Sequence, residues 1–312
     1  ADNNTAVGRS ALKANTTGTR NVAIGTVALD NGNANNDTVA IGYASLSNTS
    51  NTSAGNTAVG SYSLLSNTGD NNVAVGLCSL YSNTTASNNT ALGRKSLQAN
   101  TTGANNSAVG LNALFSNTTG ASNTAVGLSA LETNTTAANN TAVGFESLKD
   151  NTTGASNVAL GVLALTSNTT ASSNTAVGYS AMCTNTTGTG TAVGNAALAD
   201  NTTGNYNTAV GNGALADNTT ADGNLAVGHA ALRNNTTGAN NTAVGGLDSG
   251  TYGVMQANTT GCRNVAIGNA VLKSNTSGLY NTGVGYSSLA TATTGDQNAA
   301  FGINSGTSIT DG

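Results

Sequence analysis

Small apolar residues return along this chain at a fixed interval, separated by polar stretches. The tripeptide Ala-(Val/Ile/Leu)-Gly, or a close variant, ends in a glycine at positions 8, 25, 42, 60, 76, 93, 110, 127, 144, 161, 178, 194, 211, 228, 245, 268, 285 and 302. Of the seventeen intervals between these eighteen glycines, thirteen are 17 residues, two are 16, one is 18 and one is 23. Such an internal repeat constrains the fold more strongly than any single residue.

Aligned on this glycine, the units read N-T-A-V-G-x-x-A-L-x-x-N-T-T-G-x-x, and these letters define positions 1 to 17 of the repeat. Positions 1 to 5 predict a short strand with alternating faces. Positions 12 to 15 predict a turn, because Asn tolerates and Gly readily adopts left-handed backbone. Helical repeats need roughly 33 residues. We therefore predict an all-β fold: a single parallel β-solenoid (β-roll) of about eighteen 17-residue coils, continuous over residues 1–312.

Stacking would place equal positions of successive coils about 4.8 Å apart, so each position becomes a ladder. One coil cannot bury its Val and Leu alone, and we expect the ladders at positions 4 and 9 to form the core. Representative core residues are Val7, Leu12, Val126, Leu131, Val227 and Leu232. Position 1 is Asn in sixteen of eighteen units, which predicts an amide ladder. Position 3 is Ala except for Gly283, which indicates tight packing against the opposite wall or a neighbouring subunit.

The sequences NVAIG at 21–25 and 264–268, and NTAVG in many units, resemble the head repeats of trimeric autotransporter adhesins. Related repeats occur in phage tail fibres and bacterial surface fibres. The resemblance covers all eighteen units through five residues in each. It implies a left-handed parallel β-roll, assembly as a trimer, and a location outside the cell or on a cell or virion surface.

Charge and motifs argue against several classes of protein. Charged residues make up 7% of the chain, against roughly 25% in an average domain. The nine basic residues are scattered, so we expect no nucleic-acid partner. No apolar run approaches the ~20 residues that span a bilayer, so we expect no membrane insertion. The thirteen carboxylates are spread singly, and phosphate-loop, nucleophile and zinc motifs are missing. We therefore expect no enzyme, no metal site and no cofactor.

Two residue types that often carry chemistry have ordinary interpretations here. His229, the one histidine, occupies position 6, where Arg9 and Tyr43 also occur. We interpret it as one occupant of a permissive position. The three cysteines lie on separate coils, too far apart for the ~7 Å Cα separation of a disulfide. We interpret Cys78, Cys183 and Cys262 as isolated thiols, with a bridge between molecules as the alternative.

Two rows of residues are candidates for modification or contact. The turn motif N-T-T recurs twelve times and is an N-glycosylation acceptor pattern. It predicts a glycan coat on the Asn or on the Thr hydroxyls, unless Asn and Thr simply suit the turn. The candidate glycosylation residues are Asn15, Asn83, Asn117, Asn151 and Asn235. The rows of Thr also leave ice binding open. Position 6 is apolar in five successive coils, which predicts a subunit contact if it faces outward and core if it faces inward. These residues are Leu111, Leu128, Phe145, Val162 and Tyr179.

The 23-residue interval and the chain ends complete the prediction. An insertion at about 246–252 should form a surface loop, either a tolerated insertion or a binding loop. The start lacks an initiator Met, which indicates a processed form or a fragment, and both ends show little capping, which favours head-to-tail stacking. We predict a structural extracellular fibre subunit that assembles with itself, head-to-tail and/or as a trimer. The alternative is an adhesin head or tail-fibre module that recognises a cell-surface receptor or glycan.

Overall fold

The computed structural model describes residues 2–48, 53–246 and 252–310. Every strand in that part is three or four residues long, and the described residues contain no α-helix. The strands form a parallel sheet, so the predicted all-β parallel β-solenoid is confirmed. The chain divides into two compact units, Ala1–Ser156 and Asn157–Gly312.

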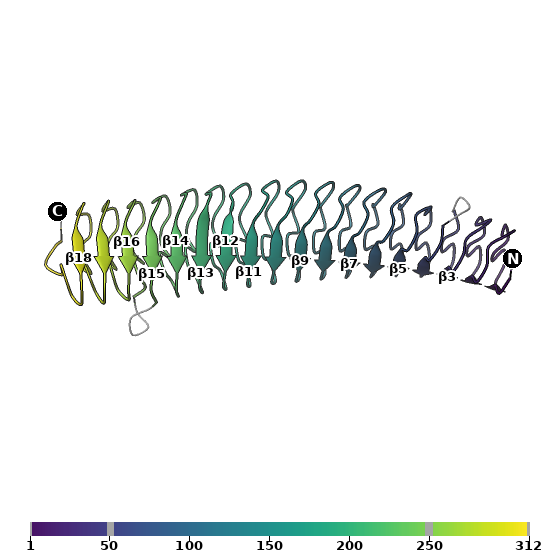
Figure 1. Cartoon of the computed structure of the whole chain (residues 1–312), viewed down its shortest axis with the longest axis horizontal. Helices are drawn as coiled ribbons and strands as arrows, with labels where there is room; N and C mark the ends of the chain where they lie inside the picture. Colours follow the sequence, from purple (N-terminus) through teal and green to yellow (C-terminus); the bar gives the residue numbers. More distant parts are fainter. Residues whose placement is uncertain (1, 49–52, 247–251, 311–312) are drawn as a thin grey trace. The chain divides into compact units, whose positions relative to one another are not determined.

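The first unit contains nine strands, each separated from the next by one turn of the chain. They are β1 (Thr5–Val7), β2 (Val22–Ile24), β3 (Val39–Ile41), β4 (Thr57–Val59), β5 (Val73–Val75), β6 (Thr90–Leu92), β7 (Ser107–Val109), β8 (Thr124–Val126) and β9 (Thr141–Val143). Each strand pairs in parallel with the next, with Ala opposite Ala and position 4 opposite position 4. This register places equal repeat positions in ladders, as the sequence predicts. Within the unit the strands follow one another side by side in chain order (Figure 1).

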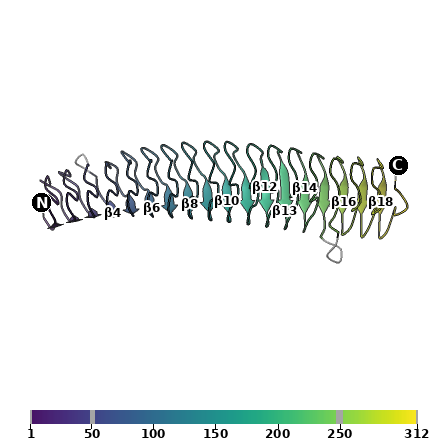
Figure 2. The same ribbon diagram turned by 180° about the vertical axis from the view of Figure 1, so that it is seen from behind.

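The second unit repeats this arrangement with nine further strands. They are β10 (Val158–Leu160), β11 (Thr175–Val177), β12 (Gly190–Val193), β13 (Asn207–Val210), β14 (Leu225–Val227), β15 (Thr242–Val244), β16 (Val265–Ile267), β17 (Thr282–Val284) and β18 (Ala299–Phe301). All neighbouring pairs are again parallel and in register. Within each unit the strands lie side by side along one wall of the coils, and the irregular segments form the rest (Figure 2).

The interior of a coil is small and is filled from two sides. The alanines at position 3 point inward, and from Ala23 to Ala266 they are fully buried, whereas Ala6 in the first coil is exposed. The leucines at position 9 are buried opposite them, as at Leu131. A Cβ atom placed on Gly306, at position 9, would lie 3.2 Å from the Cβ of Ala300, at position 3. One Leu, one Ala and the small residue at position 8 therefore fill the core of a coil.

The prediction that the valines at position 4 form the core is wrong. Val7 is 57% exposed and Val126 is 37% exposed, and Val227 is only partly buried. Since successive side chains of a strand point to opposite faces, an inward Ala at position 3 forces positions 2 and 4 outward. The leucine part of the prediction is confirmed at Leu131 and Leu232, whereas Leu12 is half-buried. Of the two alternatives for the layer that packs against position 3, the opposite wall of the same solenoid is the one observed.

Two ladders of asparagine connect the coils through buried hydrogen bonds. At position 1, the Oδ1 of Asn89 accepts from the backbone N–H of Asn106 on the next coil (2.9 Å). At position 12, the Nδ2 of Asn134 donates to the Oδ1 of Asn117 on the preceding coil (2.9 Å) and to the carbonyl oxygen of Ala137 (3.1 Å). Buried polar groups need such partners. The predicted amide ladder at position 1 is present, although it bonds to backbone, and position 12 adds a ladder that joins side chains directly.

Left-handed backbone at fixed positions lets each coil bond to both neighbours. Ser129 and Leu131, at positions 7 and 9, have φ angles of 55° and 53°. The Ser129 N–H donates to the Leu111 carbonyl on the preceding coil, and the Leu131 N–H donates to the Ser147 carbonyl on the next. Non-glycine residues rarely adopt this conformation. In this conformation the N–H groups of positions 7 and 9 point along the stack in opposite directions, one to each neighbouring coil. The hydrogen bonds that they form compensate the strain of the left-handed backbone.

Candidate functional site

The side chains at positions 2 and 4 form the outer sheet face, which repeats from coil to coil in each unit. Position 4 is aliphatic or Phe in every coil, and position 2 is Thr, Val, Leu, Ser or Ala, so neither position carries a charge. Position-4 residues such as Ile24, Leu92, Leu160 and Ile267 are exposed in the single chain. Large exposed apolar surfaces of this kind are typical of interaction sites.

The apolar residues at position 6 also face outward. Leu111, Leu128 and Phe145 are exposed in the first unit, and Val162 and Tyr179 are exposed in the second. The core alternative for this row is therefore wrong, and the subunit contact stays a prediction. The three residues of the first unit follow strands β7, β8 and β9, whose valines lie two residues earlier. In these coils exposed apolar side chains therefore occur at position 6 as well as at position 4.

The candidate glycosylation residues are not available for a glycan. Asn83, Asn117, Asn151 and Asn235 are fully buried, and Asn15 is half-buried. The Nδ2 atom of Asn235 donates to the Oδ1 of Asn218 (2.9 Å) and to the Gly238 carbonyl (2.9 Å). A glycan on that nitrogen would remove one of these bonds and would have no space. N-linked glycosylation at these four buried asparagines is therefore contradicted, and the turn interpretation of N-T-T agrees with the buried asparagine. A glycan on the threonine hydroxyls stays a prediction.

The two threonines of the motif point in different directions. The Oγ1 of Thr118, at position 13, donates to the carbonyl of Thr135 on the next coil (3.1 Å). Thr119, at position 14, is exposed. The motif therefore places one Thr in the hydrogen-bonded wall and one on the surface, so the adjacent pair does not form a double row on one face.

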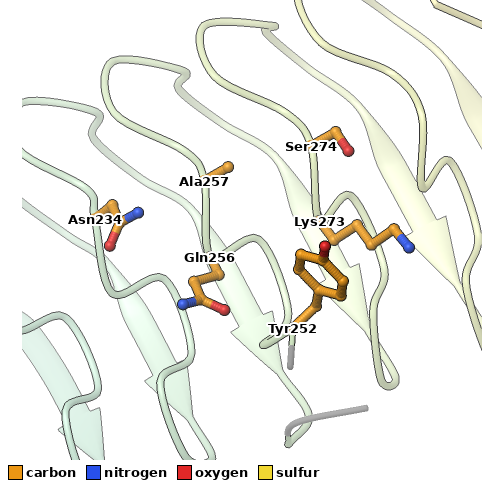
Figure 3. A pocket seen from close by; sticks show the side chains of 6 residues that line it. All are labelled: Asn234, Tyr252, Gln256, Ala257, Lys273 and Ser274. Carbon is orange, nitrogen blue, oxygen red and sulfur yellow. The ribbon is translucent and has the colours of Figure 1, made fainter. Parts of the chain in front are cut away.

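A depression lies beside the end of the insertion in the second unit. Its volume is about 420 Å³, and it is lined by Asn234, Tyr252, Gln256, Ala257, Lys273 and Ser274 (Figure 3). The lining comes from positions 10 and 11 of successive coils, with Tyr252 added by the insertion. The Lys273 Nζ lies 4.8 Å from the centre of the Tyr252 ring, a cation–π geometry. The Gln256 Oε1 accepts from the Gly253 N–H (2.8 Å), which orients the amide.

A second depression lies at another break in the period. Its volume is about 430 Å³, and its lining includes Ser172, Thr189, Thr191, Tyr206 and Thr208. The interval between Gly178 and Gly194 is one residue shorter than the standard 17. Tyr206 stands at its edge and is 82% exposed. Both depressions thus occur where the repeat is irregular.

The insertion itself lies mostly beyond what the structure describes. Residues 247–251 fall outside the described residues, so the predicted surface loop at 246–252 is represented only by Gly246 and Tyr252. The sequence prediction missed the depression, because the residues at positions 10 and 11 are variable and carry no motif. The 23-residue interval was the available signal.

The remaining candidate residues stand apart. His229 is exposed at position 6, and Cys78, Cys183 and Cys262 are free thiols. Burial, with a smaller effect from the Asp200 carboxylate, raises the pKa of the Cys183 thiol. Among the described residues, no three His, Cys, Asp or Glu side chains cluster as metal ligands would. Residues 2–48, 53–246 and 252–310 also include no helix of the length and apolarity that a membrane span requires.

Comparison with known protein families finds no matching family model, and comparison with curated proteins finds no match. The fold is a parallel β-solenoid with coils of about 17 residues, which is compatible with a β-roll repeat protein. The finer resemblance to adhesin heads and tail fibres rests on the pentapeptide alone.

Proposed function

We propose that this protein is a structural subunit that assembles with copies of itself through the outer sheet face. The observation that carries the proposal is the exposure of the aliphatic side chains at position 4, such as Val7 and Val126. Side chains of this kind are expected in a core, and in the described part of the single chain nothing covers them. With a ~4.8 Å spacing and a face about 10 Å wide, nine coils give a flat footprint of about 400 Å² in each unit. Each unit by itself therefore offers about half of the ~800 Å² that each partner contributes to a standard stable interface.

A second copy is the occupant that best suits this face. Another copy presents columns of the same spacing, so aliphatic side chains can interdigitate as identical segments do in dry sheet interfaces. Neither face carries charges that would be buried or repel each other. Assembly as a trimer, or head-to-tail into a filament, is supported by the resemblance to fibre repeats. The same resemblance supports a location outside the cell or on a cell or virion surface, and a role without catalysis.

Sedimentation of the purified chain tests the proposal. We expect the wild-type protein to sediment as an oligomer, and the double variant Val126→Lys/Val143→Lys to sediment as a monomer with unchanged far-ultraviolet circular dichroism. The matched control is Thr136→Lys/Thr153→Lys, which places the same charges at exposed position 14 of the same coils. A monomeric wild type, or an oligomer insensitive to the face variant, would overturn the proposal. Electron microscopy then separates long filaments from short rods.

A further inference from the structure

We propose that the depression beside Tyr252 is a binding site for a saccharide that carries a carboxylate. This site is distinct from the outer sheet face and goes beyond the structural role proposed above. It lies at positions 10 and 11 of the coils, whereas the outer sheet face comprises positions 2 and 4. Failure of one proposal therefore leaves the other unaffected.

Tyr252 gives the depression a flat apolar wall. Its side chain is exposed beside Lys273, and both project from neighbouring segments of the chain (Figure 3). An aromatic ring of this kind packs against the C–H face of a sugar and keeps its hydroxyl in contact with water. The regular coils lack this wall, because positions 10 and 11 lie along the surface of each coil without an inserted residue beside them.

The amide and hydroxyl groups around the ring suit a ligand rich in hydroxyl groups. The Gln256 Oε1 accepts from the Gly253 N–H (2.8 Å), so the Nε2 keeps two N–H donors that a ligand can use. Asn234 and Ser274 add an amide and a hydroxyl from the flanking coils. Such groups both donate and accept hydrogen bonds, as the hydroxyls of a saccharide require.

Lys273 determines the charge of the ligand. Its ammonium lies over the Tyr252 ring at 4.8 Å, and among the described residues it has no carboxylate within the 4.0 Å of an ion pair. A carboxylate on the ligand would complete a charge-assisted hydrogen bond with this ammonium. The lining carries one cation and no Arg, which suits a single carboxylate better than the several charges of a polyphosphate.

Calorimetric titration of the full chain with oligogalacturonate, and with a neutral galactose oligomer of equal length, tests the site. We expect the acidic oligomer to bind more tightly. The Lys273→Met variant should weaken its binding roughly tenfold or more, the effect of losing one charged hydrogen bond. The Tyr252→Ala variant should abolish binding, because the wall is lost.

Matched controls lie elsewhere on the chain. Lys95 is stacked over Phe115 at 5.7 Å on coils of regular period, so Lys95→Met removes an equivalent cation without touching the depression. Tyr206→Ala removes an exposed tyrosine from the second depression. Both controls should bind as the wild type does. The proposal is overturned if the acidic oligomer does not bind, if Tyr252→Ala and Lys273→Met leave its affinity unchanged, or if the neutral oligomer binds equally well.

Discussion

Gly283 lies directly against Val271 inside the solenoid. A Cβ atom on Gly283 would approach the Cγ1 of Val271 to 2.6 Å, well inside van der Waals contact. Gly283 is the one position-3 residue that is not alanine, and it is buried. Val271 occupies position 8, where most coils have Ala or Ser. The larger side chain on one wall is thus accommodated by the smaller one opposite.

This relationship predicts strong coupling between the two positions. Gly283→Ala alone should destabilise the protein by about 1–3 kcal/mol, the usual cost of overpacking. In a Val271→Ala background the same change should be neutral or stabilising, since alanine restricts the unfolded chain and then fits. Denaturant unfolding of the two single variants and the double variant measures the coupling. Additive effects would show that Val271 does not set the size of position 3.

The glycine at position 5 should not tolerate a side chain. At Gly76 the φ angle is 134°, and a Cβ would lie 2.6 Å from the carbonyl oxygen of Gly93 on the next coil. Gly76→Ala should therefore cost ~1–3 kcal/mol for the backbone conformation alone, and more for the clash. The control is Gly213→Ala, where nothing lies within 4 Å and where Ala196 and Ala230 adopt the same left-handed conformation in other coils. A comparable loss of unfolding free energy in both variants would contradict the close-approach explanation.

The ladder at position 12 predicts an asymmetry between amide and carboxylate. Asn134→Asp replaces the Nδ2 donor by an oxygen that faces the Asn117 Oδ1 and the Ala137 carbonyl. We expect a loss of several kcal/mol at neutral pH, because an unpaired charge is buried. Burial would raise the pKa of the new carboxyl in the folded chain above its value in the unfolded chain. The loss of unfolding free energy is therefore present above the pKa of the unfolded chain, and it shrinks as the pH falls through the pKa of the folded chain. Thermal unfolding between pH 3 and pH 7 measures how this loss of stability changes with pH, with Asn139→Asp at an exposed position as the control. A loss of stability that grows on acidification would contradict the prediction.

The repeat length and the strand positions could be predicted, whereas the choice of inward face could not. Alternation shows that position 3 opposes positions 2 and 4, but it leaves open which side is inside. Val is larger than Ala, and size alone suggested that Val126 was core. A coil this short encloses space for one large side chain, and Leu131 fills it. The signal for the inward face was the range of residues that each position accepts. Position 2 accepts Thr, Val and Leu, whereas position 3 accepts no polar residue, which indicates that position 3 faces the core.

The candidate site was less accessible to sequence reasoning. N-T-T is the same motif whether its Asn points outward or, as at Asn117, inward into a ladder. The residues around Tyr252 lie at the variable positions 10 and 11 and carry no motif, and they come together only when the coils stack. Breaks in the period were the visible feature in the sequence, and they mark both depressions.

Cys183 should react as a thiol with a raised pKa. Its Sγ lies 3.6 Å from the carbonyl oxygen of Ala199, to which it donates, and burial is the main cause of the shift. Alkylation of a Cys78→Ser/Cys262→Ser protein should therefore accelerate only above the ordinary thiol pKa. The Asp200 carboxylate adds to the shift, so Asp200→Asn should lower the pKa of the thiol and speed alkylation at a fixed pH. A rate profile centred below the pKa of a free thiol would contradict this environment.

Leu131→Ala and Val126→Ala should separate folding from assembly. Leu131 is fully buried, so its truncation should cost about 2–5 kcal/mol of unfolding free energy. Val126, on the outer sheet face, is 37% exposed, and its truncation should cost the isolated chain much less. Chemical unfolding under conditions that keep the chain monomeric measures the first effect, and the concentration dependence of sedimentation measures the second. If the outer sheet face mediates self-association, Val126→Ala weakens the oligomer while leaving monomer stability nearly unchanged. Equal destabilisation of the monomer by both variants would show that position 4 contributes to the core of the single chain.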